Sequence, residues 1–281
     1  MIDYEKEFER PTYVEKTDLV AATFKRVYGW MCGGLLLSGL VAWYTATSGL
    51  WQKVLMGPGM MICLVVEVAL VIGLSAGIRK MSAAVAALLF AVYAAVNGLT
   101  LSIVFIAYKL AVVERVFFIT AGMFGGFALY GTLTRSDLSS IGSVCGMGLW
   151  GLIVAGLVNI FFGATRFDWI ISIAGIVIFS GLTMYDAQKV KALAAAEGSL
   201  DSATARKLGI LGALNLYLDF VNLFLYLLRF FGRGIDIVIQ LVHGIVSFIR
   251  AKNRLFKCLN SFPAQLVDLR YRNKQTVVQL G

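Results

Sequence analysis

Residues 216–232 read LYLDFVNLFLYLLRFFG, an apolar run that nevertheless contains an aspartate and an asparagine. The wider stretch 208–230 is long enough to cross a bilayer core, which takes about 20 apolar residues in a helix. An ionised carboxylate at that depth costs at least ~2.5 kcal/mol, so we expect Asp219 to have a function. The sequence therefore indicates a membrane protein whose function depends on its intramembrane carboxylates.

One face of this segment is polar. Successive polar or small residues are three and four positions apart, so all of them lie on one side of a helix. They are Gly212, Asn215, Asp219, Asn222, Tyr226 and Arg229. Such a stripe has to face protein or water, not lipid. Asn215 and Asn222 are typical of interhelical hydrogen bonding, and they are also candidate pore-lining residues.

The rest of the chain repeats the apolar pattern. Of 281 residues, 59% are hydrophobic, and mean hydropathy is +0.81. Continuous apolar runs predict helices, since strands of a membrane barrel would alternate. The predicted spans are 27–49, 56–78, 82–108, 113–134, 141–164, 168–187 and 208–230. We predict an all-α seven-transmembrane-helix bundle over residues 27–232, a polar N-terminal segment 1–26 and an amphipathic basic C-terminal tail 233–281.

Composition also excludes several classes of function. The chain has one histidine, His243, in the tail, so neither a histidine-based catalytic triad nor a zinc-binding histidine pair fits the apolar body. We expect no enzyme activity and no resident cofactor. The net charge of +9 does not indicate nucleic acid, because basic loops in so apolar a chain serve membrane orientation. In the N-terminal segment and the loops between the spans, twelve basic residues lie on the side of the N-terminus and four on the other, which predicts a cytoplasmic N-terminus.

The tail does not fit this orientation. Residues 251–281 carry six basic residues and one acid, which favours the inner side, whereas seven spans place residue 231 outside. Segment 235–249 has one polar stripe, typical of a helix that lies in the membrane interface. Three alternatives stay open: the tail lies outside, the seventh span is re-entrant, or 235–249 crosses the membrane.

Three acidic residues fall in apolar spans: Glu67, Asp186 and Asp219. Asp186 ends the sixth predicted span, so both aspartates can lie in the inner half, with Asp219 deeper. Two carboxylates brought together in a low dielectric cannot both ionise cheaply and titrate as a unit, which would make the pair a proton sensor. Fully ionised, the pair offers hard oxygen ligands suited to calcium. Alternatively, Asp186 is merely solvated at a helix end beside Lys189.

Glu67 lies in the middle of the second predicted span. It can pair with a basic group, hydrogen-bond to Asn97 or Asn159 across helices, or be protonated and inert. It is also a candidate pore-lining residue. Arg79, at the inner end of the same span, is a candidate latch, because its pairing with a carboxylate can be exchanged for a proton or a cation.

Five stretches carry a family resemblance. They are VYGWM at 27–31, NGLTLSIVFIAY at 97–108, TRSDLSSIG at 134–142, MYDAQKVK at 184–191 and LYLDFVNLFLYLLRFFG at 216–232. With these motifs, residues 20–232 resemble the bacterial branch of the Bax-inhibitor-1 family of membrane proteins. The last two motifs are the most specific.

The resemblance implies a seven-helix fold whose last helix is central and wrapped by the other six. It also implies a pH-sensitive calcium leak in the bacterial inner membrane, with Asp186 and Asp219 as the di-aspartyl sensor. In that family an arginine of the second helix latches the closed state. Here the expected position is Gly77, and Arg79 is the nearest arginine.

A second function follows from the same resemblance. Some bacterial members are similar to modulators of a membrane-bound ATP-dependent protease, and the polar segment 1–26 could serve as a handle for such a partner. Cation flux into liposomes separates the two hypotheses, because a pure interaction protein would show none at any pH.

Overall fold

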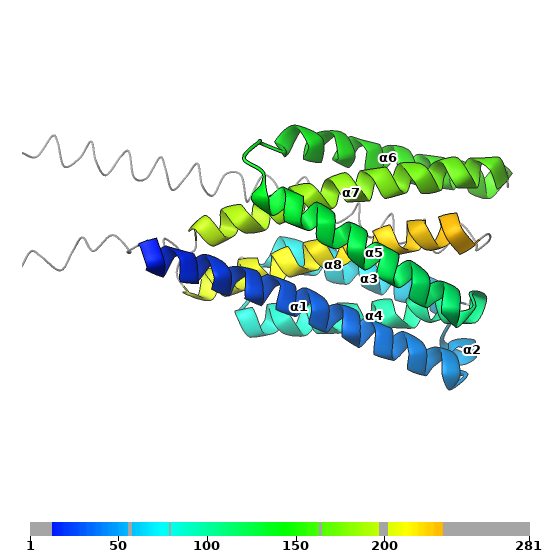
Figure 1. The fold of residues 1–281 in the computed structure, drawn as a ribbon. Helices are drawn as coiled ribbons and strands as arrows, with labels where there is room; N and C mark the ends of the chain where they lie inside the picture. Colours follow the sequence, from blue (N-terminus) through cyan, green and yellow to red (C-terminus); the bar gives the residue numbers. More distant parts are fainter. Residues whose placement is uncertain (1–12, 56–57, 79, 163–164, 197–201, 233–281) are drawn as a thin grey trace, which may run out of the picture.

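The computed structural model describes residues 13–55, 58–78, 80–162, 165–196 and 202–232, and all regular structure within them is helical (Figure 1). The elements are α1 (Tyr13–Thr47), α2 (Leu50–Leu55), α3 (Gly59–Gly77), α4 (Ala83–Ala107), α5 (Leu110–Leu133), α6 (Ser139–Phe162), α7 (Thr165–Ala196) and α8 (Ser202–Gly232). All except the six-residue α2 are long and apolar enough to cross a membrane. The predicted seven-span, all-α class is confirmed.

Most predicted spans agree with the helices to within a few residues. The third was predicted at 82–108, and α4 runs from Ala83 to Ala107, with the Ser82 hydroxyl accepting a hydrogen bond from the Val85 amide at its start. α1 begins at Tyr13, inside the segment predicted as polar. The tail 233–281 lies outside the described residues. Because α8 is continuous over 31 residues, a re-entrant seventh span is wrong.

The sixth span differs from its prediction in a way that matters for function. It was predicted to end at 187, but α7 continues to Ala196. The added segment consists largely of strong helix formers such as alanine, lysine and leucine. Its Val190 and Ala194 are buried in the bundle. The charged residues after 185 end the apolar run, but the helix continues past them. Asp186 therefore lies well inside α7 and not at its end.

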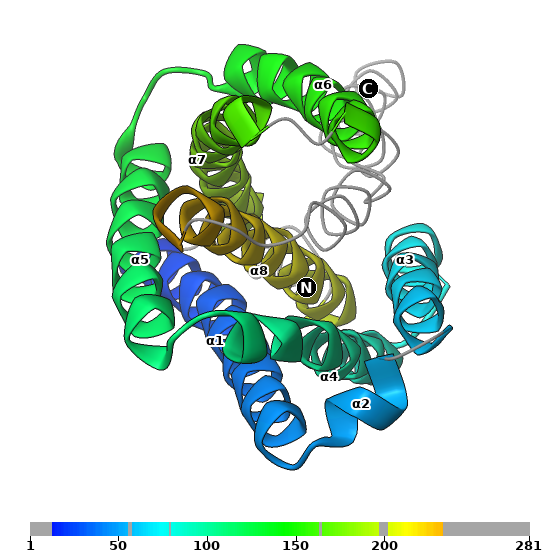
Figure 2. The ribbon, with the colours of Figure 1, turned by 90° about the vertical axis from the view of Figure 1, so that its right-hand side faces the viewer.

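The last spanning helix, α8, is the centre of the bundle. In the most apolar stretch of α8, 83% of the residues are buried, compared with 28% in the corresponding stretches of α1, α5 and α6. Its main neighbours are α7, α1, α5 and α4, while α3 packs chiefly on α4 and α6 on α7. Figure 2 shows α8 in the interior of the bundle with α3 and α6 farther out. The central position is confirmed, and direct packing involves mainly four of the six other spanning helices.

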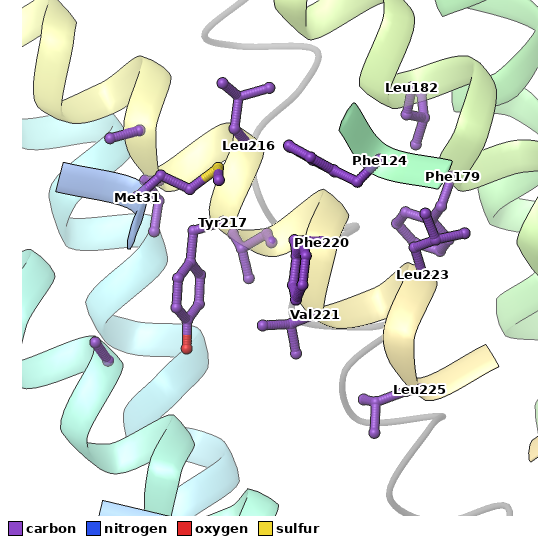
Figure 3. Packing of buried hydrophobic residues seen from close by; sticks show 14 of the residues in the cluster. Met31, Phe124, Phe179, Leu182, Leu216, Tyr217, Phe220, Val221, Leu223 and Leu225 are labelled. Carbon is purple, nitrogen blue, oxygen red and sulfur yellow. The ribbon is translucent and has the colours of Figure 1, made fainter. Parts of the chain in front are cut away.

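Aromatic and leucine side chains fill the core around α8. Phe220 and Phe124 have ring centroids 5.4 Å apart, and Phe179 of α7 stacks on Tyr226 at 5.6 Å. Figure 3 shows Leu216 and Phe220 of α8 together with Phe124 of α5 and Phe179 of α7. Lipid tails are as apolar as leucine, so shape complementarity and polar contacts hold such a bundle more than apolar burial does.

A glycine contact fixes the position of α7 against α5. A Cβ on Gly131 would lie 2.0 Å from the carbonyl oxygen of Met184, so no side chain fits at position 131. Small residues allow such close backbone approach in membrane bundles. The contact lies two residues before Asp186 and therefore helps to set where that carboxylate sits.

Candidate functional site

The register of α7 against α8 brings Asp186 and Asp219 to a similar depth. The helices pack antiparallel, and Val190 Cγ2 lies 3.6 Å from the place a Cβ on Gly212 would take. At the other end of the contact, Phe179 stacks on Tyr226. Each residue along α7 matches one residue in the opposite direction along α8, since both rise ~1.5 Å per residue. Counting from the first contact places Asp186 level with residue 216, and counting from the second places it level with residue 219.

Both carboxylates are buried. Asp186 is 2% exposed and Asp219 is 0% exposed. Asp186 is therefore not a solvated helix-end residue. Its Oδ1 lies 3.5 Å from the Nζ of Lys189, which is 21% exposed and lies 4.3 Å from the centre of the Tyr185 ring. Lys189 is thus a cation beside this acid, one helical turn further along α7.

Two of the motifs that carry the family resemblance meet next to Asp186. The Gln188 side chain donates to the Ser136 carbonyl at 2.7 Å and accepts from the Leu138 amide at 2.9 Å. Lys191 Nζ donates to the Thr134 carbonyl at 3.0 Å. These bonds attach the α5–α6 connection to the part of α7 that directly follows Asp186. Asp186 is therefore held in a segment fixed to a second loop.

The polar stripe of α8 is enclosed by protein, as predicted. Asn222 is 1% exposed, and its Nδ2 donates to the Leu218 carbonyl of the same helix at 2.7 Å. Asn215 is half-buried. Both sides of α8 are buried in the bundle, so the polar stripe does not mark a solvent-exposed face.

The stripe ends in an ion pair that the sequence analysis missed. Arg229, 8% exposed, pairs through Nη2 with Asp168 Oδ1 at the start of α7, and Asn159 Nδ2 donates to the same oxygen. Asp168 had been taken as the edge of an apolar run and not as an intramembrane acid. The available signal was Arg229 itself, because a buried guanidinium needs a carboxylate and α7 begins where α8 ends.

Glu67 belongs to a separate group of polar residues. It is 0% exposed, and Thr100 Oγ1 donates to its Oε1 at 2.7 Å. The backbone carbonyl of Asn97 lies 2.9 Å from the same Thr100 Oγ1, whereas Asn159 is bonded to Asp168 instead. Arg79, the candidate latch, lies outside the described residues.

The carboxylates do not form a metal cage. Among the described residues, no group of three or more histidine, cysteine, aspartate or glutamate side chains could hold a metal ion.

Comparison with known proteins identifies the family. The family model described as inhibitor of apoptosis-promoting Bax1 matches residues 20–235. The chain belongs to the Bax inhibitor-1 family. It is therefore an integral membrane protein, as its seven spanning helices indicate, and the resemblance read from the motifs is confirmed.

Several relatives extend over most of the chain. The inner membrane protein YbhL of Escherichia coli is 46% identical over 209 residues, which are 74% of this chain and 89% of that protein. An uncharacterised protein of Borreliella burgdorferi is 40% identical over 210 residues, 74% of this chain and 90% of the relative. Protein RP147 of Rickettsia prowazekii is 36% identical over 238 residues, 84% of this chain and all of its own length.

Proposed function

We propose that this protein is a pH-sensitive cation leak, with calcium as its cargo, and that Asp186 and Asp219 form its gate. The observation that carries the proposal is the burial of two carboxylates at one depth on neighbouring helices, one of which is the central helix. Paired acids in a low dielectric share protons, so their combined charge changes in steps with pH. A change of charge at the gate alters the contact between α7 and α8.

The ionised and protonated gates have different partners. With both protons lost, two negative charges at one depth repel each other and attract a hard divalent cation. With a proton present, the pair packs with less charge. Lys189 lies beside Asp186 and can balance the remaining negative charge. In the family, this role belongs to an arginine.

We also propose that the protein resides in the bacterial inner membrane with its N-terminus in the cytoplasm. The excess of basic residues on the N-terminal side supports this orientation. The printed name of the Escherichia coli relative supports the membrane. The gate then lies nearer the cytoplasmic side, because α7 descends to it and α8 rises from it.

Reconstitution tests the leak. The purified full chain is placed in liposomes loaded with a calcium-sensitive dye, and calcium entry is followed from acidic to alkaline pH. We expect flux whose rate depends on pH in the wild type and loses that dependence in Asp219→Asn. Asp137→Asn is the matched control, because it makes the same carboxylate-to-amide change at an exposed loop position. Absence of flux at every pH would favour the alternative, a binding partner of a membrane-bound protease.

A further inference from the structure

Glu67 is a buried carboxyl group to which the proposed gate assigns no part. It lies in the middle of α3 with no exposed surface. Among the described residues no lysine or arginine forms an ion pair with it, and its Oε2 has no hydrogen-bond partner. An ionised carboxylate with one oxygen unsatisfied and no counter-charge is very costly in a low-dielectric interior. A neutral acid in the same place is much less so.

The hydroxyl of Thr100 can serve both protonation states. Its Oγ1 lies 2.7 Å from Glu67 Oε1 and 2.9 Å from the Asn97 carbonyl oxygen, and it has one hydrogen to donate. When Glu67 is ionised, Thr100 donates to the carboxylate. When Glu67 carries a proton, the acid can donate to Thr100, which then donates to the Asn97 carbonyl. The second arrangement satisfies both contacts without a buried charge.

Among the described residues, the ionisable groups that are coupled to Glu67 carry no charge at neutral pH. The ionisable groups that interact with it are Cys63 on α3 and Tyr217 on α8, and both types lose a proton only in alkaline solution. α4 supplies Thr100 and Asn97, which do not titrate.

We propose that Glu67 is a second proton-binding site, separate from Asp186 and Asp219, in which protonation is read by the direction of the Thr100 hydrogen bond. On deprotonation the Glu67 O–H bond breaks, the proton passes to water, and the Thr100 hydrogen turns from the Asn97 carbonyl to the carboxylate. The bonds and charges balance without any other reactant. The site does not depend on calcium being the cargo of the gate.

A hydrogen-bonded chain links this site to the central helix. The Tyr217 hydroxyl donates to Asn97 Oδ1 at 2.9 Å and lies 2.7 Å from Ser38 Oγ of α1, which also bonds to the Ala94 carbonyl of α4. Tyr217 extends from α8 away from Phe124 and Phe179 in Figure 3. It precedes Asp219 by two residues. The charge on Glu67 therefore acts on the helix that carries one half of the gate.

Infrared difference spectroscopy tests the proton directly, without measuring flux. The full chain in lipid is recorded at neutral pH, and the carbonyl stretch of protonated carboxylic acid is compared between the wild type and Glu67→Gln. We expect Glu67→Gln to remove a band that Asp219→Asn retains. A Glu67→Gln spectrum equal to the wild type in this region would overturn the proposal.

Variants at position 100 test the partner. Thr100→Val should keep the acid band but shift it to higher frequency, because the acid loses its hydrogen bond, while Thr100→Ser should leave it in place. An unshifted band in Thr100→Val would show that the hydroxyl does not read the proton. Should the valine variant fail to fold, the serine variant still decides: a band displaced despite the retained hydroxyl would equally contradict the assignment.

Discussion

The two ends of the α7–α8 contact treat buried acids differently. At one end Asp168 is matched by the buried guanidinium of Arg229 and by the Asn159 amide, so charge is balanced by a fixed partner. At the other end Asp186 and Asp219 bring two carboxylates to one depth, and the neighbouring Lys189 is partly exposed. The first arrangement joins the two helices by a buried ion pair, and we propose that the second makes their contact responsive to protons. We expect α7 and α8 to separate at the Asp186 end while the Arg229 end stays closed.

The largest expected effect is on gating. Asp219→Asn keeps the shape of the side chain and removes its titration, so calcium flux should become equal at acidic and alkaline pH. Dye-loaded liposomes measure this, with Asp137→Asn retaining the wild-type profile. A pH profile unchanged by Asp219→Asn would place the sensor elsewhere in the bundle.

The next prediction asks whether the two carboxylates act as one unit. Each single variant, Asp186→Asn or Asp219→Asn, should abolish most of the pH response, and the double variant should add little. Flux is measured for all four proteins of the cycle. Additive single effects would mean that a shared depth on neighbouring helices does not bring these groups into contact.

Breaking the Arg229–Asp168 ion pair should lower the stability of the fold and leave the pH response of flux unchanged. Asp168→Asn leaves the Arg229 guanidinium buried without its counter-charge, and loss of one partner of a buried pair costs about 3 kcal/mol or more. Because Asp168 is 35% exposed, the lower end of that range applies. Thermal unfolding in detergent measures the loss, and the double variant Asp168→Asn with Arg229→Met should recover most of it. No recovery in the double variant would show that the pair is not the source of the loss.

The contrast between the two ends also shows what a sequence can predict. The spans and the burial of Asp219 follow from apolar runs along one dimension, whereas the apolar run of the sixth span left Asp186 at a helix end. The Arg229–Asp168 pair and the attachment of Gln188 to the 134–138 connection depend on which helices are neighbours and in what register. Those are three-dimensional facts that spacing alone does not contain. The length of α7 is another example: the helix continues beyond its apolar run because its last turns are amphipathic and pack on the bundle.

A smaller effect is expected at the hydrogen-bonded chain between α1, α4 and α8. Tyr217→Phe removes the donor to Asn97 Oδ1 and the contact with Ser38, and a buried acceptor left unsatisfied costs ~1–3 kcal/mol. Thermal unfolding should show this loss, while the pH profile of flux shifts without disappearing. If Tyr217→Phe abolished the pH response completely, the hydrogen bonds between α1, α4 and α8 would control gating, which would contradict the assignment of the sensor to the aspartate pair.

The smallest expected effect concerns Asp137, an exposed acid in the α5–α6 connection. Its carboxylate accepts hydrogen bonds from the Ser139 hydroxyl at 2.6 Å and the Ser139 amide at 2.9 Å, forming a turn that leads into α6. These bonds, from the hydroxyl first, lower the pKa of Asp137 below its ordinary value. A lowered folded-state pKa contributes stability above the unfolded value, about 3.9, and that contribution disappears as pH falls through the folded value.

Asp137→Asn isolates this contribution, because asparagine keeps an acceptor for Ser139 but does not titrate. We expect the melting temperatures of Asp137→Asn and the wild type to differ slightly near neutral pH, in favour of the wild type, and to converge at acidic pH, as the pH falls through the folded-state pKa of the wild-type carboxylate. The full chain in detergent is compared at both pH values, with Asp137→Ala as the variant that loses the turn altogether. A difference that widens on acidification would have the wrong sign and would show that the unfolded chain, not the folded turn, holds the ionised form of Asp137 more strongly.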